Sequence, residues 1–125
     1  AIKSVKKGGT ILIAARCEEG IGSVDFEELI LNTSSAPAFL ERLNEPDFFA
    51  IDQWQLQELC KVLNKAEVML FAEGIGEEYK GKLLVNLISS MQEGLEGALL
   101  KHGSDARIAV VPKGPYVLTR IREKN

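Results

Sequence analysis

Short apolar runs without regular alternation recur along the chain, and they predict buried strands. The first is TILIAAR at residues 10–16, and the second is EVMLFA at 67–72. The third, LLVNLI at 83–88, is compatible with a helix but favours a strand, because a glycine precedes it and serines follow. Two further runs, RIAVV at 107–111 and YVLTRI at 116–121, flank the turn sequence PKGP. Strands that are covered on both faces have this pattern.

Helical spacing dominates the segments between these runs, and the clearest case follows the sequence DQW. Apolar side chains recur there at i, i+3, i+4 and i+7, which is the pattern of one buried helix face. Asp52, with Gln55 three residues on, predicts the start of this helix as a capping box. The residues of the buried face are Leu56, Leu59, Cys60 and Leu63.

Capping residues predict three further helices. Ser23 precedes a short one, and Pro37 suits the first turn of a second that extends to about residue 43. Ser90 and Glu93 form another capping box at the start of the third.

The last predicted helix carries two glycines and the chain's single histidine. Gly94 and Gly97 each cost about 1 kcal/mol relative to alanine, which indicates close packing against another element. Gly103 is the expected stop. His102 lies in the last turn, where contact with the terminal carbonyl groups is a more common role than metal binding or proton transfer.

The order of elements predicts an α/β fold, because helices recur between the apolar runs. We expect a single three-layer-like domain over residues 1–125, with a mostly parallel central sheet and helices on its faces. A chain of 125 residues with 46% hydrophobic content can bury one core. The opening AIKSVKKGG reads as the tail of a helix that stops at Gly8 and Gly9, so we expect the chain to be part of a longer protein.

Composition narrows the class of partner. A net charge of −3 with interspersed signs gives no basic field of the kind that nucleic acid or anionic membranes require. The apolar runs are shorter than a membrane span of about 20 residues, and we expect a cytoplasmic protein. Cys17 and Cys60 suit a reducing compartment better than a disulfide framework. We expect Cys60 to be buried, and Cys17 lacks a nearby histidine that would make it a nucleophile.

The tetrapeptide EGIG follows each of the first two runs, where parallel sheets bind ligands. A dinucleotide fingerprint needs a third glycine, but Asp25 and Tyr79 occupy the equivalent positions, and neither copy ends like a P-loop. Each loop is therefore either a glycine-permitted turn, which is the more frequent case, or a contact for a small polar substrate.

Trp54 lies about 200° around its helix from Leu56 and therefore points away from the buried face. It stands beside Gln53 and behind Phe48 and Phe49. It can line a ligand cleft or a domain interface, or it can pack beneath the preceding loop.

Three stretches carry a resemblance to a known family: VKKGGTILIAARCEEGIGS-x-x-F, PDFFAIDQWQLQELCKVLNKAEVMLF and DARIAVVPKGPYV. Over nearly its whole length the chain resembles the carboxyl-terminal domain of the nickel-dependent lactate racemase family, and the DQW sequence is the most specific match. The resemblance implies a two-domain protein with a nickel-pincer nucleotide, a pyridinium derivative whose sulfur and carbon atoms bind nickel. Hydride would pass from the α-carbon of a 2-hydroxy acid to this cofactor and return to either face.

The resemblance also implies that much of the site lies outside this chain. In the family, the cofactor-tethering lysine, the nickel-binding histidine and the acid–base histidines belong to the amino-terminal domain. A Tyr-Gln-x-x-Lys stretch that holds the substrate carboxylate belongs to the helix just before the opening residues. We therefore expect this fragment alone to contain no catalytic residue, bind no nickel and racemise nothing. Its expected partners are the amino-terminal domain and a small 2-hydroxy acid.

The same resemblance selects candidate cleft residues. Trp54 matches a family tryptophan on the substrate side of the cleft, with Gln53 as a weaker neighbour. The first EGIG, through Gly20, Gly22 and Ser23, belongs to a family-like segment that is expected to face the cleft, whereas the second is expected to be a turn.

Two other interpretations remain open at this point. A helix tail ending in KKGG before TILIAA imitates part of an S-adenosylmethionine-dependent methyltransferase, although three helices before the next strand fit that class poorly. A non-enzymatic α/β domain could instead dock a partner through Trp54, Phe48 and Phe49, and an exposed apolar patch would distinguish it.

Overall fold

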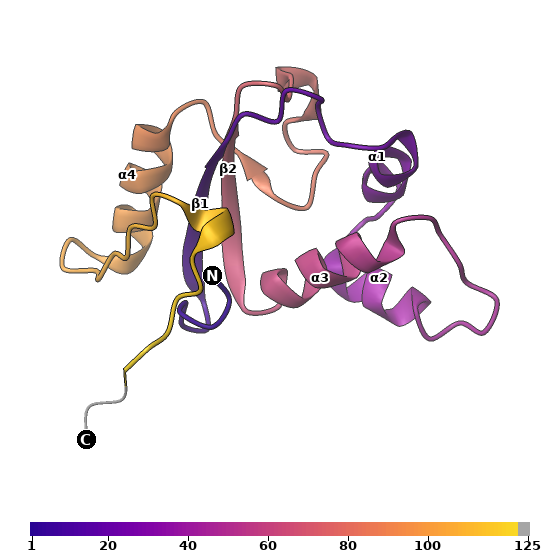
Figure 1. Cartoon of the computed structure of the whole chain (residues 1–125), viewed down its shortest axis with the longest axis horizontal. Helices are drawn as coiled ribbons and strands as arrows, with labels where there is room; N and C mark the ends of the chain where they lie inside the picture. The colour runs from indigo at the N-terminus through magenta and orange to yellow at the C-terminus, as the bar shows by residue number, and fades with distance from the viewer. Residues whose placement is uncertain (123–125) are drawn as a thin grey trace.

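A parallel sheet forms the centre of the molecule, for which a computed structural model describes residues 1–122 (Figure 1). Its strand order is β1 (Gly9–Ala15), β2 (Ala66–Ala72) and β3 (Asn86–Leu87). β1 and β2 pair along their whole length, whereas β3 adds only two residues beside β2. The first two apolar runs are thus confirmed as strands, and the third contains a strand shorter than its apolar pattern.

Helices cover both faces of this sheet. α1 (Val24–Leu31), α2 (Ala36–Arg42) and α3 (Gln53–Leu63) form a group on one side, and α4 (Met91–His102) lies on the other (Figure 1). The three-layer α/β architecture with a parallel sheet is therefore confirmed.

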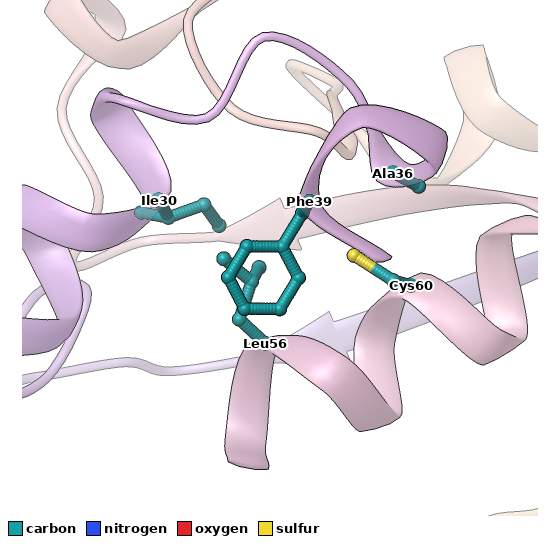
Figure 2. Packing of buried hydrophobic residues seen from close by; sticks show 5 residues of the cluster. All are labelled: Ile30, Ala36, Phe39, Leu56 and Cys60. Atoms are coloured by element: carbon teal, nitrogen blue, oxygen red, sulfur yellow. The ribbon is translucent and has the colours of Figure 1, made fainter. Parts of the chain in front are cut away.

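The main core lies in the group of three helices. Its buried side chains point toward one another from α1, α2 and α3 (Figure 2). They are Ile30, Ala36, Phe39, Leu56 and Cys60. Burial raises the pKa of the Cys60 thiol above its ordinary value, as expected of a cysteine that serves as a small apolar side chain.

Glycine allows α4 to approach the sheet closely. A Cβ atom at Gly94 would lie 2.5 Å from the Cδ1 atoms of both Leu12 and Ile88, so a larger residue requires these side chains to move. The close packing expected at Gly94 is confirmed. At Gly97 the nearest atom would be Met69 Cε at 3.9 Å, an ordinary van der Waals contact, so the same expectation is wrong there.

Serine caps begin three helices as the sequence predicts. The hydroxyl groups of Ser23, Ser35 and Ser90 each accept a hydrogen bond from the backbone N–H three residues later. The Glu93 carboxylate in turn accepts from the backbone N–H of Ser89, and α4 ends at Gly103 with φ of 92°.

Three expected elements are absent from residues 1–122. The opening AIKSVKKGG forms turns, with a single helix-type hydrogen bond from Val5 N to Ala1 O at 3.2 Å. Residues 107–111 and 117–121 belong to no strand, and η2 (Gly114–Tyr116), a short 3-10 turn, takes the first residue of the second run. The prediction of strands in these two runs is therefore wrong: their composition is β-prone, but they find no pairing strand in the described part of the chain.

Candidate functional site

The two EGIG loops lie against each other at the carboxyl ends of β1 and β2. Gly74 N donates to Arg16 O at 2.8 Å, and a Cβ atom at Gly74 would overlap the carbonyl oxygen of Cys17. In the first loop, Gly20 and Gly22 have φ of 73° and 127°, which favours glycine. The second loop is a turn as predicted. Its Gly74 has no positive φ; glycine is required there because the backbone of the first loop lies too close for a side chain.

Ser23 joins the first loop to the DQW segment. Its hydroxyl accepts from Phe26 N at 3.1 Å and donates to Asp52 Oδ2 at 2.6 Å. One side chain therefore caps α1 and connects it to a residue 29 positions later in sequence. The structure thereby brings together the two segments that contain the candidate cleft residues.

Asp52 does not cap α3, so the capping box predicted with Gln55 is wrong. The residue has φ of 60°, in the left-handed region, and its side chain makes no capping hydrogen bond. The carboxylate is directed to Ser23 instead. Gln53 stabilises the preceding turn, because its Oε1 accepts from Ala50 N at 2.8 Å.

Trp54 stands in solvent at the start of α3, with 64% of its surface exposed. Leu56, two residues later, is fully buried, so the prediction that Trp54 points away from the buried face is confirmed. Phe49 and Ile51 are also exposed, at 79% and 56%. We call Phe49, Ile51 and Trp54 the exposed apolar cluster; it begins in the loop that projects beyond α2 and α3 (Figure 1).

Phe48 does not belong to this cluster, so its expected role with Phe49 as an exposed docking pair is wrong. Its ring meets that of Phe39 edge to face, with centroids 6.1 Å apart. The Arg42 guanidinium lies over the Phe48 ring, 4.3 Å from its centroid. The two adjacent phenylalanines thus divide between core and surface.

A shallow hollow of about 270 Å³ at the carboxyl ends of β2 and β3 was not predicted from the sequence. The second EGIG and the start of η1 (Glu77–Tyr79) line one side, and Ser89 lies on the other. Only the meeting of these strand ends could have indicated it. Glu73, Glu77 and Lys80 give its rim both signs of charge.

Tyr79 connects η1 to α1. Its hydroxyl donates to the Glu27 carboxylate, and this hydrogen bond is the main cause of a raised Tyr79 pKa. The contact holds the second EGIG region near the helix that Ser23 caps.

The part of the chain between residues 1 and 122 contains no group of three or more histidine, cysteine or acidic side chains placed to hold a metal ion. His102 lies at the opposite end of the sheet, where its Nε2 is 2.9 Å from Thr10 Oγ1. The expected role of His102 at the carbonyl groups of its own helix is therefore wrong. The histidine connects α4 to β1 because the last turn of α4 passes over the amino end of that strand.

Glu67 lies at the centre of the same polar cluster. It accepts hydrogen bonds from Lys101 at 2.8 Å and Asn86 at 2.7 Å, and Thr10 lies 3.5 Å away. The Lys101 hydrogen bond is the main reason that the Glu67 pKa is lowered, against the opposing effect of burial.

The α/β fold agrees with the family comparison. The sequence model of the lactate racemase C-terminal domain matches residues 1–119, and the chain belongs to this family. Lactate racemases from Lactiplantibacillus plantarum and Thermoanaerobacterium thermosaccharolyticum are each 26% identical to it over 117 residues. These matches cover 92% of this chain but 28% of either relative, so the chain spans under a third of their length.

A solved structure is similar over nearly the whole chain. The lactate racemase apoprotein from Thermoanaerobacterium thermosaccharolyticum superposes with a TM-score of 0.83 and 26% identity, covering 96% of this chain and 29% of that one. Family membership gives the methyltransferase interpretation no support. No helix in residues 1–122 is long and apolar enough to cross a membrane.

Proposed function

We propose that this chain is the carboxyl-terminal domain of a two-domain 2-hydroxyacid racemase or epimerase that uses a nickel-pincer nucleotide. The observation that carries the proposal is the exposed Trp54 of the DQW sequence, joined to the first EGIG segment by the 2.6 Å bond from Ser23 to Asp52. An exposed tryptophan on a well-packed helix is available to close over a ligand held by another domain.

The cofactor would accept and return the substrate hydride in the complete enzyme. No cluster in residues 1–122 can hold its nickel, so the metal ligands and the tethering lysine belong to the amino-terminal domain in this proposal. The present chain is then inactive by itself.

The side chains at the start of α3 have distinct proposed roles. Trp54 supplies an apolar wall that excludes water from the reacting centre. The side-chain oxygen of Gln53 accepts a hydrogen bond from Ala50 N. The side-chain NH2 group of Gln53 is then the part that donates to a substrate oxygen. Ser23 and Asp52 hold the start of α3 against the first loop, where Gly20 and Gly22 shape the backbone.

The test is the intact mass and nickel content of the full-length protein, purified from cells that make the pincer cofactor. We expect one nickel per chain and a mass increase on a lysine of the amino-terminal domain. A panel of chiral 2-hydroxy acids would then identify the substrate. Apoprotein alone, stabilised against heat by S-adenosylmethionine, would contradict the proposal, as would apoprotein that neither ligand stabilises.

A further inference from the structure

The carboxyl-terminal arm, which we define as residues 107–122, exposes an unusual amount of apolar surface. It leaves α4, passes across β1 in the view of Figure 1 and then extends away from the sheet. Val110 is 81% exposed and Tyr116 is 89% exposed. The other large apolar residues of the arm that stand exposed are Ile108, Val111, Val117, Leu118 and Ile121. Apolar surface of this extent marks an interaction site.

The arm also leaves its backbone unpaired. In the described residues, no backbone-to-backbone hydrogen bond involves 107–112 or 118–122. Val117 has φ of −120° and ψ of 123°, which are strand values. Extended backbone with free N–H and C=O groups and β-branched side chains is a template for strand pairing.

An open groove of about 430 Å³ separates the two apolar runs of the arm. Val110, Val111 and Pro112 line one side, and Val117 and Ile121 line the other. The groove can accept apolar side chains from a partner while the unpaired backbone receives the partner's strand.

The charge of the arm restricts the chemistry of that partner. Arg107, Lys113, Arg120 and Arg122 lie within the arm, which contains no acidic residue. A chain with a net charge of −3 thus concentrates positive charge on its unpaired segment. A complementary surface is an apolar sheet edge bordered by carboxylates.

We propose that the arm pairs as β-structure with the amino-terminal domain of the same protein. More than two-thirds of the length of each lactate racemase relative lies outside its match to this chain, which leaves room for such a domain. Ser4 donates a hydrogen bond to Thr119, so the arm lies beside the opening residues, where the proposed amino-terminal domain would join the chain. The arm is then a non-covalent connection between the domains, additional to the backbone that joins them, on a different element from the exposed apolar cluster at α3.

The inference rests on the proposed function only in requiring an amino-terminal domain. Its test is hydrogen exchange of the full-length protein, read by mass spectrometry, together with nickel analysis of the same sample. We expect amides of 108–111 and 117–121 to exchange on the order of 100-fold more slowly than an unstructured peptide. Val110→Asp should remove most of this protection and expose one strand of the amino-terminal domain. Leu100→Asp, at an 88% exposed position of α4, is the matched control. It should change neither the exchange of the arm amides nor the exchange of the amino-terminal domain.

The possible outcomes separate the two proposals. Protected arm amides that Val110→Asp releases, with cross-links from Lys113 to the amino-terminal domain, support the inference whether or not nickel is present. Exchange as fast as an unstructured peptide overturns it even if the protein carries nickel. Protection that disappears on dilution as a dimer dissociates also overturns it, because the partner is then a second copy.

Discussion

The indole of Trp54 is 64% exposed, whereas Leu56 on the same helix is fully buried. Exposed side chains contribute little to folding, so Trp54→Ala in the full-length protein should change the free energy of unfolding by less than about 0.5 kcal/mol. If the indole closes over the substrate, the same substitution should lower turnover about 10-fold or more, because it opens the site to water. Enzyme kinetics and urea unfolding measure the two effects separately.

Leu56→Ala is the matched control for this prediction. Removing a fully buried leucine from the core of α1, α2 and α3 should cost about 2–5 kcal/mol. Unchanged kinetics for Trp54→Ala, with a stability loss approaching that of the control, would make Trp54 a packing residue.

Residue-level predictions succeeded where one local rule decides the outcome. Ser90 caps α4 as expected, and Glu93 accepts from the N–H of Ser89, one residue before the cap, because both donors lie within four residues of their acceptors. Asp52 and Gln55 matched the capping pattern equally well, but the Asp52 carboxylate accepts a hydrogen bond from Ser23, the cap of α1, which only the fold brings near. Helical spacing similarly placed Trp54 outside the core but could not reveal the bond that fixes its helix.

The contact between α4 and β1 depends on which glycine faces the strand. Gly97→Ala should stabilise the chain by about 0.5–1 kcal/mol, because alanine favours the helix and meets only an ordinary contact. Gly94→Ala should destabilise it by about 1–2 kcal/mol, since overpacking against Leu12 and Ile88 outweighs the helical preference. Urea unfolding of the two variants measures whether each substitution raises or lowers the free energy of unfolding. Stabilisation by both substitutions would show that the contact of α4 at Gly94 has room for a methyl group.

The polar cluster at the other end of α4 predicts an acid dependence. The pKa of Glu67 is lowered in the folded chain from its ordinary value of 4.5, chiefly by the Lys101 hydrogen bond. Its stabilising contribution is therefore complete above that ordinary value and is lost as the pH falls through the folded value. Glu67→Gln should unfold more easily at pH 7 and show a flatter loss of stability below about pH 5.

Urea unfolding at a series of pH values measures this dependence. Glu96→Gln is the control, because Glu96 lies exposed on α4 and accepts a hydrogen bond only from Gln92 among the described residues. Parallel curves for wild type and Glu67→Gln would mean that another group causes the acid sensitivity.

Element-level prediction depended on whether each apolar run has its partner in this chain. β1 and β2 pair with each other, so their patterns gave nearly correct boundaries. Residues 107–111 and 116–121 have comparable strand composition, yet no strand within residues 1–122 receives them. The amino-acid composition of a segment indicates that it is suited to a sheet. It does not indicate which part of a protein supplies the neighbouring strand.

Across the whole molecule, the chain divides its polar groups between two ends of the sheet. Ser23, Asp52 and Gln53 lie with the first loop on the side proposed to face the other domain, whereas His102 and Glu67 stabilise α4 at the amino ends of the strands. Resemblance pointed to the first group, since its residues adjoin the two motifs that resemble the family, the first EGIG segment and DQW. The second group, with its partners Thr10, Asn86 and Lys101, comes from four distant segments and could not be predicted from spacing.

This division predicts that the chain's only histidine does not bind nickel in the complete enzyme. His102→Ala should reduce stability by about 1 kcal/mol, because it removes the hydrogen bond to Thr10. It should leave the nickel content and the lysine-linked mass of the full-length protein unchanged, since no metal cluster in residues 1–122 includes this side chain. Elemental analysis and intact mass of the variant test this, with Thr10→Val as the control that removes the same bond and keeps the imidazole. Loss of nickel in His102→Ala but not in Thr10→Val would assign the histidine to the cofactor and require the two domains to meet at the α4 end of the sheet.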